Sequence, residues 1–478
     1  MIFQCCYAKM ISIQNSQVVM GCRTMKGRTS NEQFRIQLDN MVQTLRSEIT
    51  GGHYNVGDYL PSEKMLASRF QFGNISVRKG LEQLVEEGLI EKIPKVGNRV
   101  KSTRSRSVTL RLACIYVTWR NCDLQRLLDM FQQKYPWITL EVTEFTRVSA
   151  LQAPPKADLF IIGELHFRQI VENGLADLLK PLTPDGDVHP LLTKQFVHED
   201  RLLFKPIVYS PIVLMYNKTH FRECGLAEPD GSWKWDDLIN AGEKLSELDE
   251  GRYGFCFHVP DINRWPLFLL QSGERFEWNG TRLKDLKGTA LLDSIRLLKR
   301  IMLNQKLFPS FLSERNQDFV KPFLEGKLSM TLLSYLGLNL FVHSNVEYDI
   351  APVPFIHEPL SLMITSAIGI NSATEHPEEA ELFVEFLTGE HAQRSIQQHT
   401  TSIPSMRSLS PSDAGNEVHR PARYGLYREM LFSMRTHMDL NLTSRELPLV
   451  FRQLKQYFAN MIDEDELCEE LARVLTRE

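Results

Sequence analysis

Basic side chains gather in one short stretch of the sequence, and their charge suits one kind of chemistry. From Lys92 to Arg106 no acidic residue occurs. Clustered lysine and arginine side chains neutralise the phosphates of a nucleic acid and supply affinity without reading its sequence. A basic stretch alone is equally typical of a solvated surface, so the elements around it must decide. Its basic residues are Lys92, Lys95, Arg99, Lys101, Arg104 and Arg106.

The residue patterns of common catalytic and metal sites do not occur in the sequence. It has no G-x-S-x-G nucleophile elbow, no H-E-x-x-H zinc helix and no complete G-x-x-x-x-G-K-[ST] phosphate loop. The eight cysteines include no C-x-x-C pair and lack the regular spacing of a disulfide framework, so we expect reduced thiols. His343 and His357 stand alone. We therefore expect no enzyme, no cofactor and no metal.

The elements before the basic stretch predict a helix-turn-helix. A capping-box pattern at Ser30 opens a long amphipathic helix, which the pair Gly51–Gly52 ends. Ser62 can cap a second, short helix, and after a tight turn a third runs from about Ile75 to Glu87. Residues 89–101 then alternate around a glycine-containing turn, which predicts a hairpin, the wing. Beside two such helices, the basic hairpin is expected to lie against DNA.

A series of residues in this region carries a family resemblance: Gly52–Glu63, Leu66–Ala67, Phe70, Val77–Arg78, Leu81, Leu84–Ile90 and Gly97. In order and spacing they resemble the GntR family of bacterial regulators, whose winged helix binds DNA. The resemblance implies DNA contacts from Lys64, Asn74, Arg78 and Gly97, with Ser76 beside them. The full predicted set of DNA-binding residues is Ser62, Lys64, Asn74, Ser76, Arg78, Lys95, Gly97 and Arg99.

The chain departs from this family in the turn before the third helix. Gly73–Asn74 stands where the family usually has Ser-Arg. An asparagine side chain can hydrogen-bond adenine or a phosphate, but it lacks the fork and the charge of arginine. We therefore expect an unusual operator sequence.

Beyond a short polar linker, the pattern changes to strands that alternate with amphipathic helices. Val108–Val117, Ile138–Phe145 and Ala157–Gly163 are expected strands, with a helix over residues 124–131 between the first two. Such alternation favours an α/β sheet rich in parallel strands.

Loose motifs in a fixed order cover this second region: Leu203–Pro206, Leu214–Lys218, Trp233–Leu238, Phe323–Met330, Tyr348–Pro354 and His376–Phe386. They resemble the family 1 extracellular solute-binding proteins, the sugar-capturing components of import systems. The resemblance implies two α/β lobes with a ligand held in the cleft between them.

Polar and aromatic side chains at the ends of expected strands are the candidates for ligand contact. Sugar recognition needs aromatic faces for the apolar side of the ring and planar polar groups for the hydroxyls. By resemblance these positions line the cleft, although each aromatic ring is also a candidate for core packing. The predicted ligand-binding residues are Trp119, Arg120, Glu164, Tyr209, Trp265 and Tyr335.

The expected organisation is an α+β winged helix-turn-helix domain followed by a two-lobed α/β periplasmic-binding-protein-like domain. Residues 1–28 form an irregular leader, whose internal methionines leave the true start open. The winged helix covers 29–102, a linker 103–107 and the effector domain 108–478.

From this organisation we expect a ligand-responsive bacterial transcription regulator. It would bind double-stranded operator DNA as a homodimer in the cytoplasm and sense a small molecule, a sugar or oligosaccharide. No run approaches the roughly 18 apolar residues that a membrane span needs. Two alternatives stay open. One is a solute-binding receptor of a carbohydrate import system without a DNA role, which requires export; the other is a sugar-processing enzyme with unrecognised carboxylates.

Overall fold

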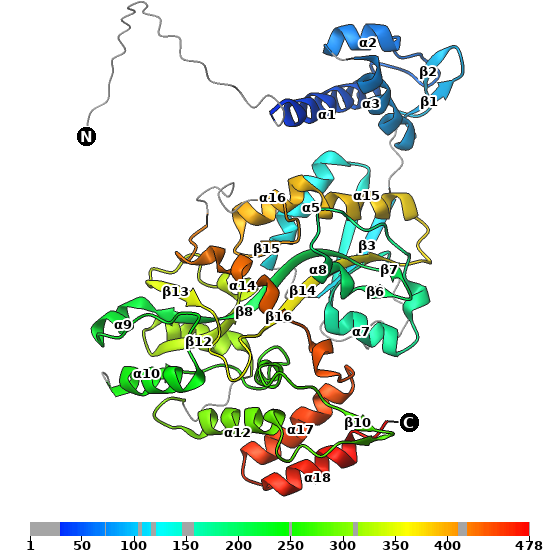
Figure 1. Ribbon diagram of the computed structural model, residues 1–478. Helices are drawn as coiled ribbons and strands as arrows, with labels where there is room; N and C mark the ends of the chain where they lie inside the picture. The colour runs from blue at the N-terminus through cyan, green and yellow to red at the C-terminus, as the bar shows by residue number, and fades with distance from the viewer. Residues whose placement is uncertain are drawn as a thin grey trace, which may run out of the picture. The chain divides into compact units, whose positions relative to one another are not determined.

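The computed structural model divides the chain into two compact units, residues 1–106 and 107–478 (Figure 1). It describes residues 29–71, 73–103, 108–115, 121–145, 157–247, 251–308, 314–409 and 418–477. Each unit is considered by itself.

The first unit consists of three helices and a hairpin. The helices are α1 (Thr29–Thr50), α2 (Glu63–Phe70) and α3 (Asn74–Glu86), and the hairpin pairs β1 (Ile90–Ile93) with β2 (Gly97–Val100). The predicted helices and wing are confirmed, with helix starts within two residues of the expected ones. Local signals explain this accuracy: the Ser62 hydroxyl accepts a hydrogen bond from the Met65 amide and caps α2.

A glycine on α3 allows the first and third helices to approach closely. A Cβ added to Gly80 would lie 2.2 Å from the Met41 side chain of α1. The buried stripe predicted for α1, including Met41, Leu45 and Ile49, therefore packs directly against Leu81 and its neighbours on α3. This contact fixes the orientation of α3.

A buried ion pair ties α1 to the end of α3. The Arg46 guanidinium donates two hydrogen bonds to the Glu87 carboxylate, of 2.7 and 2.5 Å, and both side chains are buried. Burial raises the pKa of Glu87, and the hydrogen bonds from Arg46 offset only part of that rise. The pair joins elements 41 residues apart in the sequence.

The second unit is organised around one sheet in the order β4-β3-β5-β14-β8-β12-β9. As predicted, β3 (Val108–Ile115), β4 (Ile138–Phe145) and β5 (Leu159–Gly163) run parallel. The centre of the sheet, however, is antiparallel, because β14 (Ser361–Ile370) and β8 (Lys205–Asn217) cross between the lobes in opposite directions. The remaining strands of the sheet are β9 (Tyr253–Phe255), β12 (Leu328–Ser334), β13 (Tyr348–Ala351), β15 (Ile403–Pro404) and β16 (Met434–Arg435).

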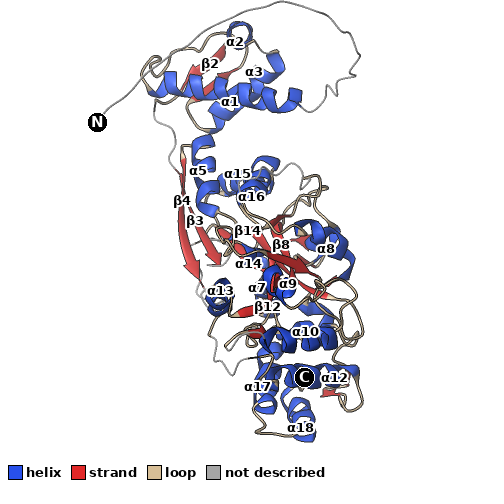
Figure 2. Ribbon diagram, turned by 90° about the vertical axis from the view of Figure 1, so that its left-hand side faces the viewer, coloured by secondary structure: helices blue, strands red, loops and turns tan. Residues whose placement is uncertain are grey.

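Helices of the first lobe cover both faces of the sheet formed by β3, β4 and β5 (Figure 2). On one face, Phe131 of α5 packs against Phe383 and Phe386 of α15, with ring centroids 4.9 and 5.3 Å apart. On the other face, Phe167 and Ile170 of α7 pack against the sheet. The elements of lobe 1 are α5 (Leu124–Lys134), α7 (Glu164–Glu172), η1 (Ala176–Leu178), α8 (Pro190–Lys194), β6 (Val197–His198), β7 (Arg201–Leu202), α15 (Pro377–Thr388) and α16 (Glu390–His399).

The second lobe has the largest of the described cores. Trp235 stacks on Phe268 at 4.4 Å and donates its indole N–H to Gln271. Helices α12, α17 and α18 lie together at the end of this lobe near the C-terminus (Figure 1). Its elements are α9 (Lys218–Glu223), α10 (Trp235–Glu247), α11 (Trp265–Leu270), β10 (Trp278–Asn279), β11 (Arg282–Leu283), α12 (Ala290–Leu303), η2 (Asn316–Phe319), α13 (Val320–Leu324), α14 (Tyr335–Leu338), η4 (Tyr424–Ser433), η5 (His437–Leu440), α17 (Glu446–Phe458) and α18 (Glu464–Val474).

Removing one partner of the Arg46–Glu87 pair should strongly destabilise the first unit. In the variant Glu87→Ala the buried guanidinium loses its counter-charge, and we expect the free energy of opening of α1 and α3 to fall by about 3–5 kcal/mol. Glu82→Ala, at an exposed position of the same helix, should change it by less than about 0.5 kcal/mol. Hydrogen–deuterium exchange of the α1 and α3 amides measures both, and equal protection in the two variants would contradict the assignment.

Candidate functional site

The third helix presents one polar face to solvent. Val77, Gly80, Leu81 and Leu84 turn towards the core, so Asn74 and Arg78, four residues apart, share the opposite face. The structure brings most of the predicted DNA-binding residues of the helix pair to the surface: Ser62, Lys64, Asn74 and Arg78 are exposed, and Ser76 is partly buried.

Two of these predicted residues already have partners within the protein. The Arg78 Nε donates to the Glu63 carboxylate at 2.6 Å, while the Arg78 side chain stays 57% exposed. Ser62 caps α2, so its hydroxyl is engaged in holding the helix. A phosphate or base that contacts Arg78 therefore competes with Glu63 for the guanidinium.

The wing places its predicted residues at and beside the turn. Lys95 and Gly97 have positive φ angles of 63° and 145°, and the value at Gly97 suits a residue without Cβ. Arg99 lies opposite Glu91 across the hairpin and donates to its carboxylate, which raises the pKa of Arg99. The predicted basic stretch begins at Lys92 and so leaves out this acidic neighbour, which lies one residue earlier. Arg104 and Arg106 lie outside the described residues.

The predicted ligand residues converge on the crossing strands. Glu164 directly follows Gly163, which pairs with Ser366 of β14, and Tyr209 pairs with Thr365 of the same strand. Tyr335 directly follows β12, whose last residue pairs with Ile212 of β8. Trp119 and Arg120 lie outside the described residues.

The four described ligand candidates are buried rather than exposed on the walls of an open cleft. Glu164, Tyr209, Trp265 and Tyr335 are each at most 8% exposed. Trp265 stacks on Phe451 at 5.5 Å, and its indole N–H is buried without a hydrogen-bond partner in the described structure. In this structure segments of the chain itself cover these side chains, and the role of the four residues in ligand binding stays a prediction.

A cluster of tyrosines covers Tyr335. Its hydroxyl donates to the Tyr424 carbonyl at 2.9 Å and accepts from the Tyr427 amide at 3.1 Å, and burial raises its pKa well above the usual value. Tyr209 meets Tyr427 edge to face. Sequence reasoning missed Tyr424 and Tyr427, because they come from a 3-10 helix almost 90 residues later, without a periodic signal.

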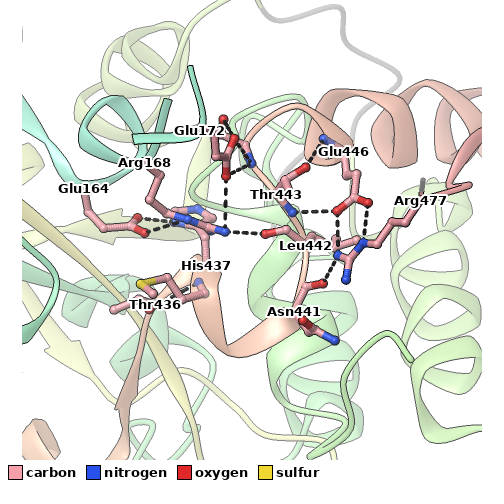
Figure 3. A network of polar contacts seen from close by, with 12 residues as sticks. Glu164, Arg168, Glu172, Thr436, His437, Asn441, Leu442, Thr443, Glu446 and Arg477 are labelled. Carbon is pink, nitrogen blue, oxygen red and sulfur yellow. Dashed lines mark hydrogen bonds and ion pairs between the residues drawn. The ribbon is translucent and has the colours of Figure 1, made fainter. Parts of the chain in front are cut away.

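Figure 3 shows a polar network that joins the two lobes. Arg168 of α7 donates to the Leu442 carbonyl at 2.6 Å and lies 3.8 and 3.6 Å from the carboxylates of Glu164 and Glu172. Glu172 in turn accepts hydrogen bonds from the amide and hydroxyl of Ser444. Because α7 belongs to lobe 1 and residues 436–446 to lobe 2, we call these contacts the interlobe bridge.

His437 contacts the bridge through both nitrogens of its ring. Its Nε2 lies 2.9 Å from the Ile262 carbonyl, which only accepts, so Nε2 carries a hydrogen. Its Nδ1 lies 3.3 Å from the Glu164 carboxyl group. That contact is a hydrogen bond only when Nδ1 also carries a hydrogen or when the carboxyl group is protonated. The loop before Trp265 and the start of α7 thus meet through His437.

The bridge continues into the C-terminal helices. Arg477 donates to the Glu446 carboxylate through Nε and Nη2, both at 2.9 Å, and to the Asn441 carbonyl (Figure 3). Burial alone would raise the pKa of Glu446, but hydrogen bonds from Arg477 and Thr443 lower it below its usual value. The segment 441–446, which contacts α7, is therefore also held by Arg477.

A cavity of about 480 Å³ opens at the end of the lobe 1 sheet where β3 and β5 begin, opposite the end at which Glu164 lies. Phe160, Ile170 and Leu179 form apolar walls, and Asp158 and His376 are among its polar groups. None of the four described ligand candidates lines it, and no signal in the sequence pointed to it.

Family models match both units. Residues 125–394, more than half of the chain, match the model described as bacterial extracellular solute-binding protein. The chain belongs to this family. Residues 38–100 match bacterial regulatory proteins of the gntR family, so a GntR domain precedes the two-lobe solute-binding fold. The two families are a regulator family and a binding-protein family.

The curated relatives are transcription regulators that match parts of the chain. Over 45 residues the chain is 44% identical to the "Probable transcriptional regulator PhnF" of Escherichia coli, covering 9% of this chain and 19% of that protein. It is 21% identical over 192 residues to the histidine utilization repressor of Klebsiella aerogenes, covering 39% of this chain and 76% of the repressor. The chain thus spans only about a fifth of the first relative.

Solved structures match the second unit in fold. The substrate-binding protein Lmo0181 of Listeria monocytogenes, in complex with cycloalternan, has a TM-score of 0.65 and 15% identity, covering 77% of this chain and 98% of that one. Maltose-bound MalE3 of T. maritima has a TM-score of 0.66 and 16% identity, covering 77% and 99%. At such identities the likeness shows the fold alone.

Two further features concern ions and membranes. Among the described residues, no three histidine, cysteine or carboxylate side chains are grouped so as to hold a metal ion. Within the part of the chain that the structure describes, no helix is long and apolar enough to cross a lipid bilayer.

Breaking the interlobe bridge should destabilise the second unit. Arg168→Ala removes the donor to Leu442 and the cation between two carboxylates, and we expect the free energy of unfolding to fall by about 2–4 kcal/mol. All six tryptophans lie after residue 107, so their fluorescence during urea unfolding reports on this unit. Arg222→Ala, which removes an exposed Arg–Glu pair on the same unit, is the matched control and should leave the midpoint unchanged. A shift of equal size in both variants would contradict a special role for the bridge.

Proposed function

We propose that this protein is a ligand-responsive transcription regulator that binds operator DNA through its first unit and a small molecule through its second. The observation that carries the proposal is the joining, in one chain, of a GntR domain and a solute-binding domain. A solute receptor of an import system has no use for a DNA-binding unit. A regulator that acts on DNA belongs in the cytoplasm.

The effector is proposed to be a sugar or an oligosaccharide. Structural neighbours have cycloalternan, maltose or D-mannitol bound. In this chain, Trp265 and the tyrosine cluster around Tyr335 offer aromatic faces, while Glu164 and Arg168 offer planar polar groups beside them. Aromatic and planar polar groups together suit the two sides of a sugar ring.

The proposed mechanism couples the lobes to the DNA-binding units of a homodimer. An effector that enters between the lobes must part the interlobe bridge, because its residues occupy that space. The change would alter how two subunits present their recognition helices to half-sites about one helical turn apart. Coupling requires that the effector bind the two arrangements with different affinities.

Arg78 is expected to be required for DNA binding. A gel-shift assay with DNA upstream of the chain's own gene should show Arg78→Ala binding at least about five-fold more weakly, since an arginine contacting base or phosphate contributes about 1–3 kcal/mol. Arg69→Ala is the matched control, because Arg69 also pairs with a glutamate on the same unit but lies at the far end of α2. It should bind within about three-fold of the unchanged protein.

Two outcomes of this assay would count against the proposal. If no DNA fragment shifts at low salt while a sugar still binds, the import-receptor alternative stands. Turnover of an oligosaccharide by the purified protein would support an enzyme instead.

The buried indole N–H of Trp265 is expected to contact the effector. Trp265→Phe keeps an aromatic ring against Phe451 but removes the N–H, so the affinity should fall several-fold, up to about ten-fold. Calorimetric titration with maltose, D-mannitol and a panel of oligosaccharides measures it. Trp233→Phe is the control, because Trp233 packs against Phe221 of α9, and neither residue belongs to the bridge. DNA affinity without effector should stay unchanged in both, and equal sugar affinities would refute the assignment.

A further inference from the structure

One side chain on the exposed face of α3 has no role in the fold. Ile75 is 84% exposed, whereas the apolar residues Val77, Leu81 and Leu84 of the same helix are buried. It follows Asn74 and lies three residues before Arg78, so its side chain neighbours that of Arg78 on the helix surface, and all three residues are exposed near the start of α3. Ile75 is not among the predicted DNA-binding residues, since an apolar side chain carries no charge or hydrogen-bonding group that would indicate DNA contact.

The charges along α3 show which end of this face approaches DNA. Asn74, Arg78 and Lys79 are exposed at the amino-terminal half, and the first turn holds no acidic residue. Glu82 and Glu86 are exposed at the carboxy-terminal half. Phosphates repel carboxylates, so the half of the helix that carries Ile75 is the half that can enter the groove.

Single exposed apolar residues are common on protein surfaces and by themselves need no explanation. Ile75 differs by its surroundings, since it lies at the exposed start of α3, next to Asn74 and one turn from Arg78, the two residues of this helix most suited to contact DNA. In the major groove, the only apolar group on a base edge is the 5-methyl group of thymine. Asparagine next to it suits adenine, which presents a donor and an acceptor to the amide.

We propose that Ile75 is a specificity-determining residue that reads a thymine methyl group in the major groove, with Asn74 reading a neighbouring adenine. The inference rests on the proposed DNA-binding function and adds to it the kind of base that the helix selects. Because Asn74 replaces the arginine usual at this turn, the helix would favour A·T-containing steps over the G contacts that an arginine fork makes.

The test uses the full chain and a selection of preferred duplexes from a random-sequence library. Each thymine of the enriched site is then replaced singly by deoxyuridine, which removes only the methyl group. At one thymine per half-site the affinity of the unchanged protein should fall about four-fold, as expected for the loss of one buried methyl group. The variant Ile75→Ala should bind both duplexes equally, because it lacks the side chain that touches the methyl group.

Val85→Ala is the matched control, since Val85 is an exposed apolar residue on the same helix but outside the amino-terminal half. It should keep the full preference for thymine over uracil. The inference is overturned if the unchanged protein tolerates uracil at every position, if no thymine is enriched, or if Ile75→Ala retains the preference. If no sequence at all is enriched, the proposed function itself fails, which is a distinct result.

Discussion

Strands β8 and β14 pair antiparallel from Met363 opposite Pro211 to Ile368 opposite Lys205, and each contributes side chains to the cores of both lobes. The lobes therefore cannot separate without breaking the centre of the sheet, and relative motion is limited to bending and twisting of these two strands. The register shifts between Ser366 and Ala367, where β14 passes into lobe 1. A bulge bends a strand locally, so this point concentrates the bending.

The contacts that oppose such bending are charged and partly buried, which makes them costly to break as well as specific. Arg168 and Glu172 hold the Leu442 carbonyl and Ser444 across the gap, and each would leave an unpaired group if the lobes parted without a replacement partner. A ligand rich in hydroxyl groups offers such partners to both sides. A polar ligand would therefore replace the hydrogen bonds that hold the lobes together, whereas an apolar ligand would leave those groups unpaired.

Sequence patterns predicted the first unit well because its signals are local. Ser62 caps the helix that follows it, and the stripe of α1 packs on the next helices. The candidate site was harder to predict, because residues that contact each other there are far apart in the sequence: His437 and Glu164 are separated by 273 residues. Tyr335 follows a strand, as predicted, and Trp265, which was expected in a loop, begins α11; the burial of both depends on later segments that cover them. The Arg99–Glu91 pair was missed because it depends on hairpin register.

The position of β14 within the sheet also sets an order of assembly. Lobe 1 needs β14 between β5 and β8, although its residues follow those of β5 by almost 200 positions and come after most of lobe 2. Neither lobe is a continuous stretch of chain, so neither can complete its core early during synthesis. The first unit, by contrast, has all its elements within residues 29–100. On the ribosome the DNA-binding unit can therefore fold long before the module proposed to control it.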